Sequence, residues 1–230
     1  IAAYFGNSVF VTVLSTALLL LFVIPISYVL ARYRFAGSKL ISTIYMACIF
    51  LQATYIMIPL FLELQAINGL NNLPVLCLVY AVMQFPFCIF TLQGFMSAVP
   101  KDYEESARID GATNLQLLLK VMVPLAKPGI ATLTMFYGVT RWNEYFRSGI
   151  YISSIKKVPL QVILRKFIVD SDVTTIIGTQ NLLNYNDLAK IDYTALQYAT
   201  IVIAVVPILL IYPLVLKYYT KGIMAGGVKE

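Results

Sequence analysis

Three charged residues stand three positions apart inside an apolar part of the sequence. They are Arg141, Glu144 and Arg147, within and just after the run TRWNEYF. On a continuous helix this spacing would place all three along one face. Two guanidinium groups and one carboxylate could bind an anionic ligand, or could pair with one another. Together with Trp142 and Asn143 they are the candidate residues for contact with a solute.

The residue types that common enzyme sites need are missing from this chain. It has no histidine, which excludes a Ser-His-Asp triad, a Cys-His pair and a His-ligated zinc site. Cys48, Cys77 and Cys88 lie in apolar runs without a CxxC pair, which is typical of small buried side chains. The phosphate-binding pattern GxxxxGK[ST] does not occur either. We therefore expect no catalytic residue, metal or cofactor in this chain.

Composition indicates a membrane protein. Hydrophobic residues make up 60% of the 230 residues and charged residues 12%, about half the roughly 25% that soluble proteins carry. A chain with so little polar surface needs lipid as its surrounding solvent. The net charge of +6 is distributed as short basic groups beside apolar runs. That placement favours membrane topology over a nucleic-acid partner.

Several apolar runs approach the roughly 20 residues that a helix needs to cross a membrane. The clear ones are 8–31, 40–62, 74–98 and 194–216. The stretch 129–152 is less clear, because the three charged residues interrupt it. The predicted fold is an all-α bundle of membrane-spanning helices.

Basic residues set the orientation of these spans. They follow the first, third and last runs, whereas the loop between the second and third runs has no Lys or Arg. The positive-inside rule makes the basic flanks cytoplasmic. An odd number of crossings must then separate Lys127 from Lys217, so 129–152 is predicted as a fifth span. Loop 100–128 and the C-terminus are expected inside, and loop 153–193 outside.

Loop 100–128 contains the most sharply punctuated part of the sequence, DYEESARIDGATNLQLLLKVMVPLAKP. Asp102 and Glu105 have the spacing of a capping box, which predicts that a helix begins there. The helix is expected to run through Ile109 and to stop where Gly111 supplies a left-handed residue.

A second short helix is predicted directly after this turn. Thr113 and Gln116 form another capping-box pattern. The helix should continue to about Met122, and Pro124 and Pro128 should end it and lead the chain back to the membrane. Doubled caps in a loop of this length predict a rigid surface for a partner; a loose solvated connector is the alternative.

The spacing in this loop resembles the coupling loop of ABC importer permeases. The motif of that family is E-A-A, three residues, G, nine residues, I, one residue, L-P. The matching positions are Glu105, Ser106, Ala107, Gly111, Val121, Val123 and Pro124. The departures are Ser for Ala and Val for Ile and Leu, all of similar size. We refer to residues 100–128 as the coupling loop.

Other segments resemble one branch of that family. RIDGAT and KGIMAGGVKE are similar to the carbohydrate-uptake branch that includes the maltose permease subunits, and TRWNEYF and VPLQVILRKF to a subset for polysaccharide fragments. The resemblance implies import of sugars or oligosaccharides. Two arginines to one acid in the 141–147 stretch point to an acidic cargo, such as alginate or pectin fragments. The family also has a further N-terminal helix, expected to be missing from a chain that opens at Ile1.

The resemblance implies a division of labour among subunits in a bacterial inner membrane. Partners would be a second, homologous permease, an external solute-binding protein, and two ATPase subunits that bind ATP and Mg²⁺. The coupling loop would dock in a cleft on the ATPase. Small residues at 106, 107, 111 and 112 (Ser106, Ala107, Gly111 and Ala112) would allow close approach, while Glu105 and Asp110 could reach donors.

The C-terminal segment KYYTKGIMAGGVKE is basic and rich in glycine. Ile223 and Met224 form an apolar insert, for which the resemblance implies a second contact with the ATPase pair; a solvated anchor is the alternative. Three other functions remain open: a permease for a non-sugar solute, an ion-coupled carrier and a membrane enzyme. A carrier would need paired intramembrane acids, and Glu144 alone does not supply them.

Overall fold

The computed structural model describes residues 1–168, 195, 198–210 and 212–213. Within these residues the chain forms helices and turns and no strand, as the all-α prediction requires. The main helices are α1 (Ala2–Arg32), α2 (Ser38–Ile49), α3 (Ala53–Ala66), α4 (Leu73–Ser97), α5 (Asp102–Ile109), α8 (Lys127–Trp142), α9 (Phe146–Tyr151) and α10 (Leu160–Ile168). Shorter ones are α6 (Asn114–Gln116), the π-helix η1 (Leu117–Met122), α7 (Val123–Leu125) and the 3-10 helix η2 (Ile155–Lys157). Another helix covers Tyr198–Leu210.

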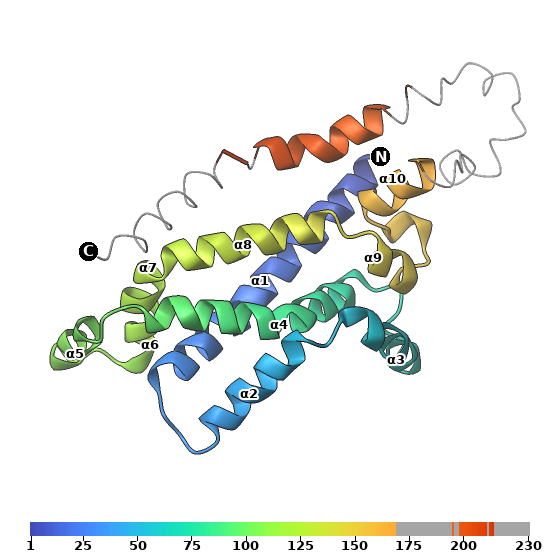
Figure 1. Ribbon diagram of the computed structural model, residues 1–230. Helices are drawn as coiled ribbons and strands as arrows, with labels where there is room; N and C mark the ends of the chain where they lie inside the picture. The colour runs from blue at the N-terminus through green and yellow to red at the C-terminus, as the bar shows by residue number, and fades with distance from the viewer. Residues whose placement is uncertain (169–194, 196–197, 211, 214–230) are drawn as a thin grey trace, which may run out of the picture.

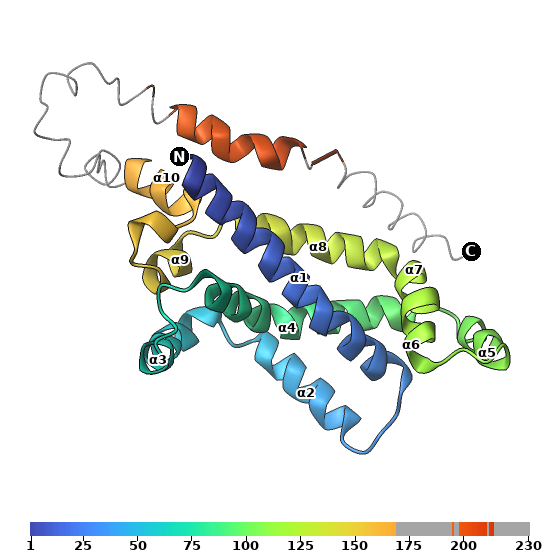
Figure 2. The same ribbon diagram turned by 180° about the vertical axis from the view of Figure 1, so that it is seen from behind.

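The long helices form a bundle with a distinct set of short helices at each end. Helices α4 and α8 run alongside each other, and α1 packs against both, most extensively against α4 (Figure 1). Helices α5, α6 and α7 gather at one end, while α9 and α10 lie at the other end near the N-terminus. The view from behind shows the same separation (Figure 2).

The face that α1 turns toward the core is marked by a regular spacing. Buried residues recur every fourth position, at Val11, Ser15, Leu19, Val23 and Ser27. Residues four apart lie on one face of a helix. The serines are small enough to bring neighbouring helices close, and the Ser27 hydroxyl donates a hydrogen bond of 3.3 Å to the Ile89 carbonyl of α4.

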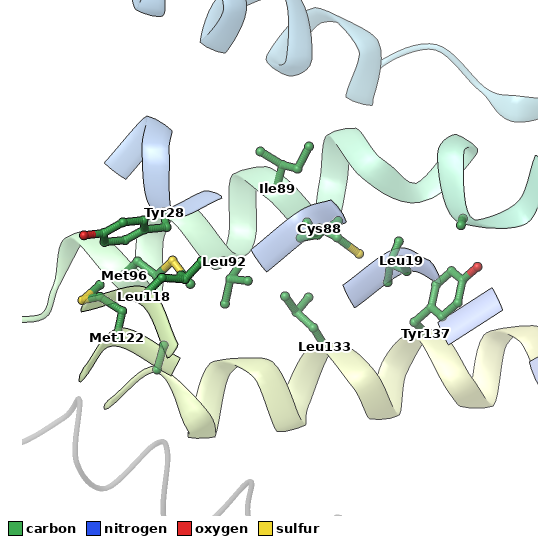
Figure 3. Packing of buried hydrophobic residues seen from close by; sticks show 13 residues of the cluster. Leu19, Tyr28, Cys88, Ile89, Leu92, Met96, Leu118, Met122, Leu133 and Tyr137 are labelled. Atoms are coloured by element: carbon green, nitrogen blue, oxygen red, sulfur yellow. The ribbon is translucent and has the colours of Figure 1, made fainter. Parts of the chain in front are cut away.

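The largest buried cluster lies where α1, α4 and α8 meet. Leu19 of α1, Ile89 of α4 and Leu133 of α8 all belong to it (Figure 3). Cys77 and Cys88 are buried and unpaired, as the sequence predicts, whereas Cys48 is half-buried.

The expected spans 8–31 and 74–98 are continuous helices, α1 and α4, each long and apolar enough to cross a membrane. The expected span 40–62 is instead broken into α2 and α3, which diverge by 102°. Helix α2 ends in hydrogen bonds of the 3-10 type, in which the Phe50 and Leu51 amides donate to carbonyls three residues earlier. Gln52, the next residue, has an extended backbone.

The expected span 129–152 is also not one helix. Helix α8 ends at Trp142, where the Asn143 side chain donates to the Val139 carbonyl. The Glu144 carboxylate then accepts from the Arg147 amide, and α9 begins at Phe146. These local side-chain bonds to the backbone accompany the break in the continuous helix that the hydrophobic pattern predicted. Helix α8 is preceded by a bend of 76° between the helical residues 114–125 and 127–142.

The described helices therefore contain two long spans, or up to four if each bent pair is counted as one. The prediction of five spans is not reached within the part of the chain that the structure describes. Span 194–216 lies only partly inside it, as the helix Tyr198–Leu210, and loop 153–193 is described only as far as residue 168.

Asn71 makes several contacts at the end of the bundle that holds α9 and α10. Asn71 has a left-handed backbone, with φ of 57°. Its side-chain oxygen accepts from the Ser153 amide at 2.7 Å and the Ser154 amide at 2.8 Å. These bonds join the turn before α4 to the segment after α9, which are remote in sequence. Both amides share the single acceptor of Asn71.

Candidate functional site

The first helix of the coupling loop begins differently from the prediction. Helix α5 starts at Asp102, its N-cap is Lys101, and no side-chain cap is formed. The predicted capping box of Asp102 and Glu105 is therefore wrong. The Lys101 backbone is already helical, and its carbonyl accepts from the Glu104 and Glu105 amides. The acids of the first turn instead complement the positive end of the helix.

The end of α5 confirms the predicted glycine turn. Gly111 has φ of +80°. Its amide donates to the Arg108 carbonyl, and the Ala112 amide donates to the Ala107 carbonyl, both at 3.0 Å. This pair of bonds is the Schellman arrangement, in which a left-handed residue closes a helix. The turn direction is therefore fixed by the backbone at Gly111.

The second helix of the loop opens on the predicted capping box. The Gln116 amide donates to the Thr113 hydroxyl at 3.3 Å, and the Thr113 amide donates to the Gln116 side chain at 2.8 Å. The helical path then runs through η1 and α7 to Leu125, past Pro124. A proline clashes with the carbonyl four residues earlier in an α-helix. The wider π-helix of η1 lies where that clash would occur.

Most of the candidate docking residues lie at the surface. Glu105, Ser106, Asp110, Gly111 and Pro124 are exposed, and Ala107 and Ala112 are half-buried. Large apolar side chains are also exposed on the same loop, a feature that the sequence interpretation missed. Ile109 is 87% exposed, and Tyr103, Leu115 and Leu119 are more than half exposed. Such side chains could anchor the loop in an apolar cleft.

A buried acid is the second feature of this loop that the sequence interpretation missed. Glu104 is buried and forms an ion pair with Arg32, the last residue of α1. Nearby, the Arg108 side chain donates a hydrogen bond of 2.9 Å to the Tyr33 hydroxyl. This bond raises the pKa of the Arg108 guanidinium above its usual value, so Arg108 remains positively charged.

The candidate solute contacts at 141–147 come together around Glu144. Its carboxylate lies 3.8 Å from Arg141 Nη2 and 3.8 Å from Arg147 Nη1, which is the geometry of the ion-paired alternative. Arg141 is only 4% exposed, and its guanidinium lies 4.5 Å from the Tyr80 ring centroid and 5.3 Å from that of Tyr137. Contacts of this kind favour a cation away from water.

The other two candidates in this stretch have structural contacts. The Trp142 indole nitrogen donates to the Ala204 carbonyl at 3.0 Å, and its ring meets Phe5 edge-on at 5.5 Å. Trp142 thus joins α8 to α1 and to the helix Tyr198–Leu210. Asn143 is exposed and caps α8. The structure therefore brings Arg141, Glu144 and Arg147 together but directs Trp142 and Asn143 to other contacts.

A cavity of about 280 Å³ lies between α4 and α8. Thr132, Phe136 and Thr140 are four residues apart and share one face of α8, and Gln84 and Phe87 face them from α4. Phe136 and Phe87 are exposed. Aromatic rings beside hydroxyl and amide groups match the two kinds of surface on a sugar ring. The sequence interpretation did not identify this cavity, which we call the groove between α4 and α8.

The remaining candidates, Ile223 and Met224, lie outside the described residues. No group of three or more Cys, Asp or Glu side chains that could hold a metal occurs among the residues that the structure describes.

Residues 23–225 match the family model described as the binding-protein-dependent transport system inner membrane component. The chain belongs to this family. The resemblance inferred from the coupling loop is thereby confirmed, and as a family member the chain is a transport subunit of the inner membrane. The type I permease fold follows from the same match.

Relatives with known names extend this comparison. The chain is 34% identical over 226 residues to Protein LplC of Bacillus subtilis, covering 97% of this chain and 73% of that one. It is 33% identical over 223 residues to the polygalacturonan/rhamnogalacturonan transport system permease YtcP of the same organism, covering 96% and 75%. It is 35% identical over 214 residues to the diacetylchitobiose uptake permease NgcG of Streptomyces coelicolor, covering 92% and 65%.

A solved structure shows the same fold. The chain is similar to a chain in the crystal structure of a bacterial ABC transporter involved in the import of the acidic polysaccharide alginate. The TM-score is 0.83 and the sequence identity 31%, and the match covers 94% of this chain and 74% of that one.

Proposed function

We propose that this chain lines the path of an ATP-driven importer whose cargo is an acidic oligosaccharide, such as a fragment of pectin or alginate. A second, homologous permease completes the path. An external solute-binding protein delivers the cargo, and two ATPase subunits hold ATP and Mg²⁺. The observation that carries the proposal is the coupling loop, which stands at one end of the bundle with Glu105, Ser106, Gly111 and Pro124 of its motif exposed.

Docking of the coupling loop on an ATPase subunit is supported by its surface. Glu105 and Asp110 lie beside the exposed Ile109, so polar and apolar contacts are available on one short helix. The Schellman turn at Gly111 fixes the direction of the second helix. A preformed loop loses little conformational entropy on binding. The tail residues Ile223 and Met224 are proposed as a weaker, second contact.

An oligosaccharide as cargo is supported by the relatives and by the groove between α4 and α8. YtcP and NgcG are named for the transport of sugar polymers or their fragments. In the groove, Phe136 lies between Thr132 and Thr140 on one face of α8. We propose that a sugar ring passes along this face, with its apolar side on Phe136.

The acidic character of the cargo is supported by charge at the end opposite the coupling loop. Arg147 is in the first turn of α9, and further basic side chains at this end are Lys156, Lys157, Arg165 and Lys166. Two of the named relatives or solved structures concern acidic polymers, polygalacturonan/rhamnogalacturonan and alginate. In this proposal, Arg147 is the residue of the 141–147 cluster that meets the cargo, because Arg141 is enclosed by two tyrosines.

The proposed orientation puts the coupling loop and the C-terminus in the cytoplasm. The cytoplasmic place of the coupling loop follows from Lys101, Lys120 and Lys127 under the positive-inside rule. The opposite end, with Arg147 and the basic residues after it, is then outside, where cargo arrives.

Uptake by the whole importer in proteoliposomes tests the proposal. The chain, its second permease and the ATPase are co-expressed and purified, and the binding protein is added with labelled cargo. We expect ATP-dependent uptake of oligogalacturonate or oligo-alginate and none of a neutral oligosaccharide of equal length. Uptake of the neutral sugar alone would refute the acidic cargo. Uptake that follows an ion gradient without ATP would refute the importer.

Two variants test the groove and the cluster separately. Phe136→Leu should raise the cargo concentration needed for half-maximal uptake, while Phe22→Leu, an exposed ring on α1, should not. Arg147→Gln should reduce uptake of the acidic cargo more than that of a partly neutralised methyl ester. Equal losses for both cargos would show that Arg147 has only a structural role.

A further inference from the structure

The end of α1 is joined to the coupling loop by a buried ion pair. Arg32 Nε lies 2.5 Å from Glu104 Oε1, and the two side chains are 6% and 10% exposed. Arg32 is the last residue of α1, and Glu104 stands in the first turn of α5. In sequence, the coupling loop is continuous only with α4 and α8. The ion pair therefore gives α1 an attachment that the chain itself does not supply.

Arg32 and Tyr33, the C-cap residue of α1, make three further hydrogen bonds, one to the link before the coupling loop and two to the loop itself. Arg32 Nη2 donates to the Val99 carbonyl at 2.6 Å, in the link between α4 and α5. The Tyr33 hydroxyl accepts from Arg108 of α5 and lies 3.0 Å from the side-chain oxygen of Asn114 in α6, to which it donates. The end of α1 thus holds both helices of the coupling loop and the link before them.

The charges at this junction suit the helix ends that bear them. The C-terminus of α1 carries partial negative charge, which favours Arg32, and the N-terminus of α5 carries partial positive charge, which favours Glu104. A buried ion pair contributes little net stability compared with apolar side chains of the same size. Removal of one partner leaves an uncompensated charge, so the pair specifies one arrangement of α1 against α5.

The other end of α1 is joined to the opposite side of the protein. The Ser8 hydroxyl accepts from the Leu160 amide at 2.8 Å. The Asn7 side chain donates to the Lys156 carbonyl at 3.0 Å and the Val158 carbonyl at 3.2 Å. Helix α1 has 31 residues, a length of about 46 Å as a helix. It therefore connects the coupling loop directly with segment 156–160.

We propose that α1 is a rod that moves with the coupling loop, and that Arg32 and Glu104 are the positioning residues that fasten it. This inference rests on the proposed docking of the coupling loop on an ATPase. Displacement of the loop then reaches the outer end by two routes. One is α8, which continues from the loop. The other is α1, whose N-terminal part is bonded to segment 156–160 at the proposed outer end.

The test compares variants of the whole importer in proteoliposomes. Glu104→Gln keeps the shape of the side chain and removes its charge. We expect the ATPase to co-purify, hydrolysis to continue, and uptake per ATP to fall about tenfold, within the range of typical coupling between sites. Arg32→Lys, with Glu104 intact, keeps a positive charge beside the carboxylate. Its uptake per ATP should therefore fall less than that of Glu104→Gln. Arg34→Met is the matched control, because Arg34 is exposed two residues away, and should behave as wild type.

A distance measurement separates positioning from simple stabilisation. Spin labels at Phe35 and Asp102, both exposed, report the separation of α1 from α5. In the wild type this distance should be the same without nucleotide and in the vanadate-trapped state. In Glu104→Gln the distribution of distances should broaden on trapping. Ser8→Ala should reduce uptake per ATP while this distance stays fixed, because it removes the bond from Ser8 to Leu160 at the outer end and leaves the Arg32–Glu104 pair intact.

Three results would overturn the inference. One is normal uptake per ATP in Glu104→Gln. Another is a fall in uptake and hydrolysis in equal proportion to the amount of assembled importer, which indicates a stabilising role alone. The third is a wild-type distance that changes on trapping. Failure of the wild-type chain to co-purify with its ATPase would instead refute the proposed docking, and the inference with it.

Discussion

Replacement of Gly111 by valine isolates the contribution of one backbone angle to transport. An added Cβ at Gly111 would meet no atom within 4 Å, so the side chain has space and the cost comes from the backbone alone. A left-handed conformation costs an ordinary residue roughly 1–2 kcal/mol, and β-branched residues are least suited to it. A change of this size shifts a local equilibrium by about 5- to 30-fold. We expect the turn that orients α6 to be populated less by that factor.

The assay is uptake per ATP hydrolysed by the assembled importer, with membrane insertion of the chain measured alongside. Gly111→Val should insert normally and lose coupling, with a loss of no more than about 30-fold from the turn alone. Gly111→Asn should stay close to wild type, because asparagine tolerates the left-handed region. Gly6→Val is the control for bulk, since Gly6 also has open space but an ordinary φ. Equal coupling in the Val and Asn variants would refute the argument from backbone strain.

Three further predictions follow from the topology, the outer junction and the tail. A cysteine at Lys156 should react with an impermeant thiol reagent added to sealed cells and one at Lys101 should not; the reverse pattern would invert the orientation. Asn71→Ala leaves two amides without their acceptor and should lower the free energy of unfolding by about 1–3 kcal/mol, whereas Asn72→Ala removes one 3.4 Å bond and should shift the thermal midpoint less. Deletion of residues 222–230 should leave the ATPase bound and weaken the coupling of hydrolysis to uptake; unaltered coupling would make the tail an anchor.

The features that could be predicted from the sequence are those decided by neighbouring residues. The Thr113–Gln116 capping box and the left-handed Gly111 both depend on bonds within a few positions, and both are present. The failure at Asp102 is local too. The capping-box pattern at Asp102 does not show that the Lys101 backbone is already helical, and that conformation moves the cap by one residue.

Features that depend on contacts between distant residues could not be predicted from the sequence. Arg32 is one of the basic residues that follow the first apolar run, and nothing near it in the sequence indicates that its partner is Glu104. The spacing of Arg141, Glu144 and Arg147 predicted one helix face, but the helix is divided where the Asn143 and Glu144 side chains bond to the backbone, between α8 and α9. Their clustering survives because Glu144 lies between the two arginines in space as well as in sequence.

The bend before α8 gives that helix the geometry of a lever. Its fulcrum lies beside the coupling loop, where Gly129 allows α4 to approach so closely that an added Cβ would lie 2.5 Å from Phe95 Cγ. The arm beyond it is the 16-residue helix α8, about 24 Å long, so a rotation of about 10° would move its far end by about 4 Å. That displacement exceeds the 3.0 Å separating the Trp142 indole nitrogen from the Ala204 carbonyl. A small rotation beside the loop is therefore enough to exchange hydrogen-bond partners at the opposite end of the bundle.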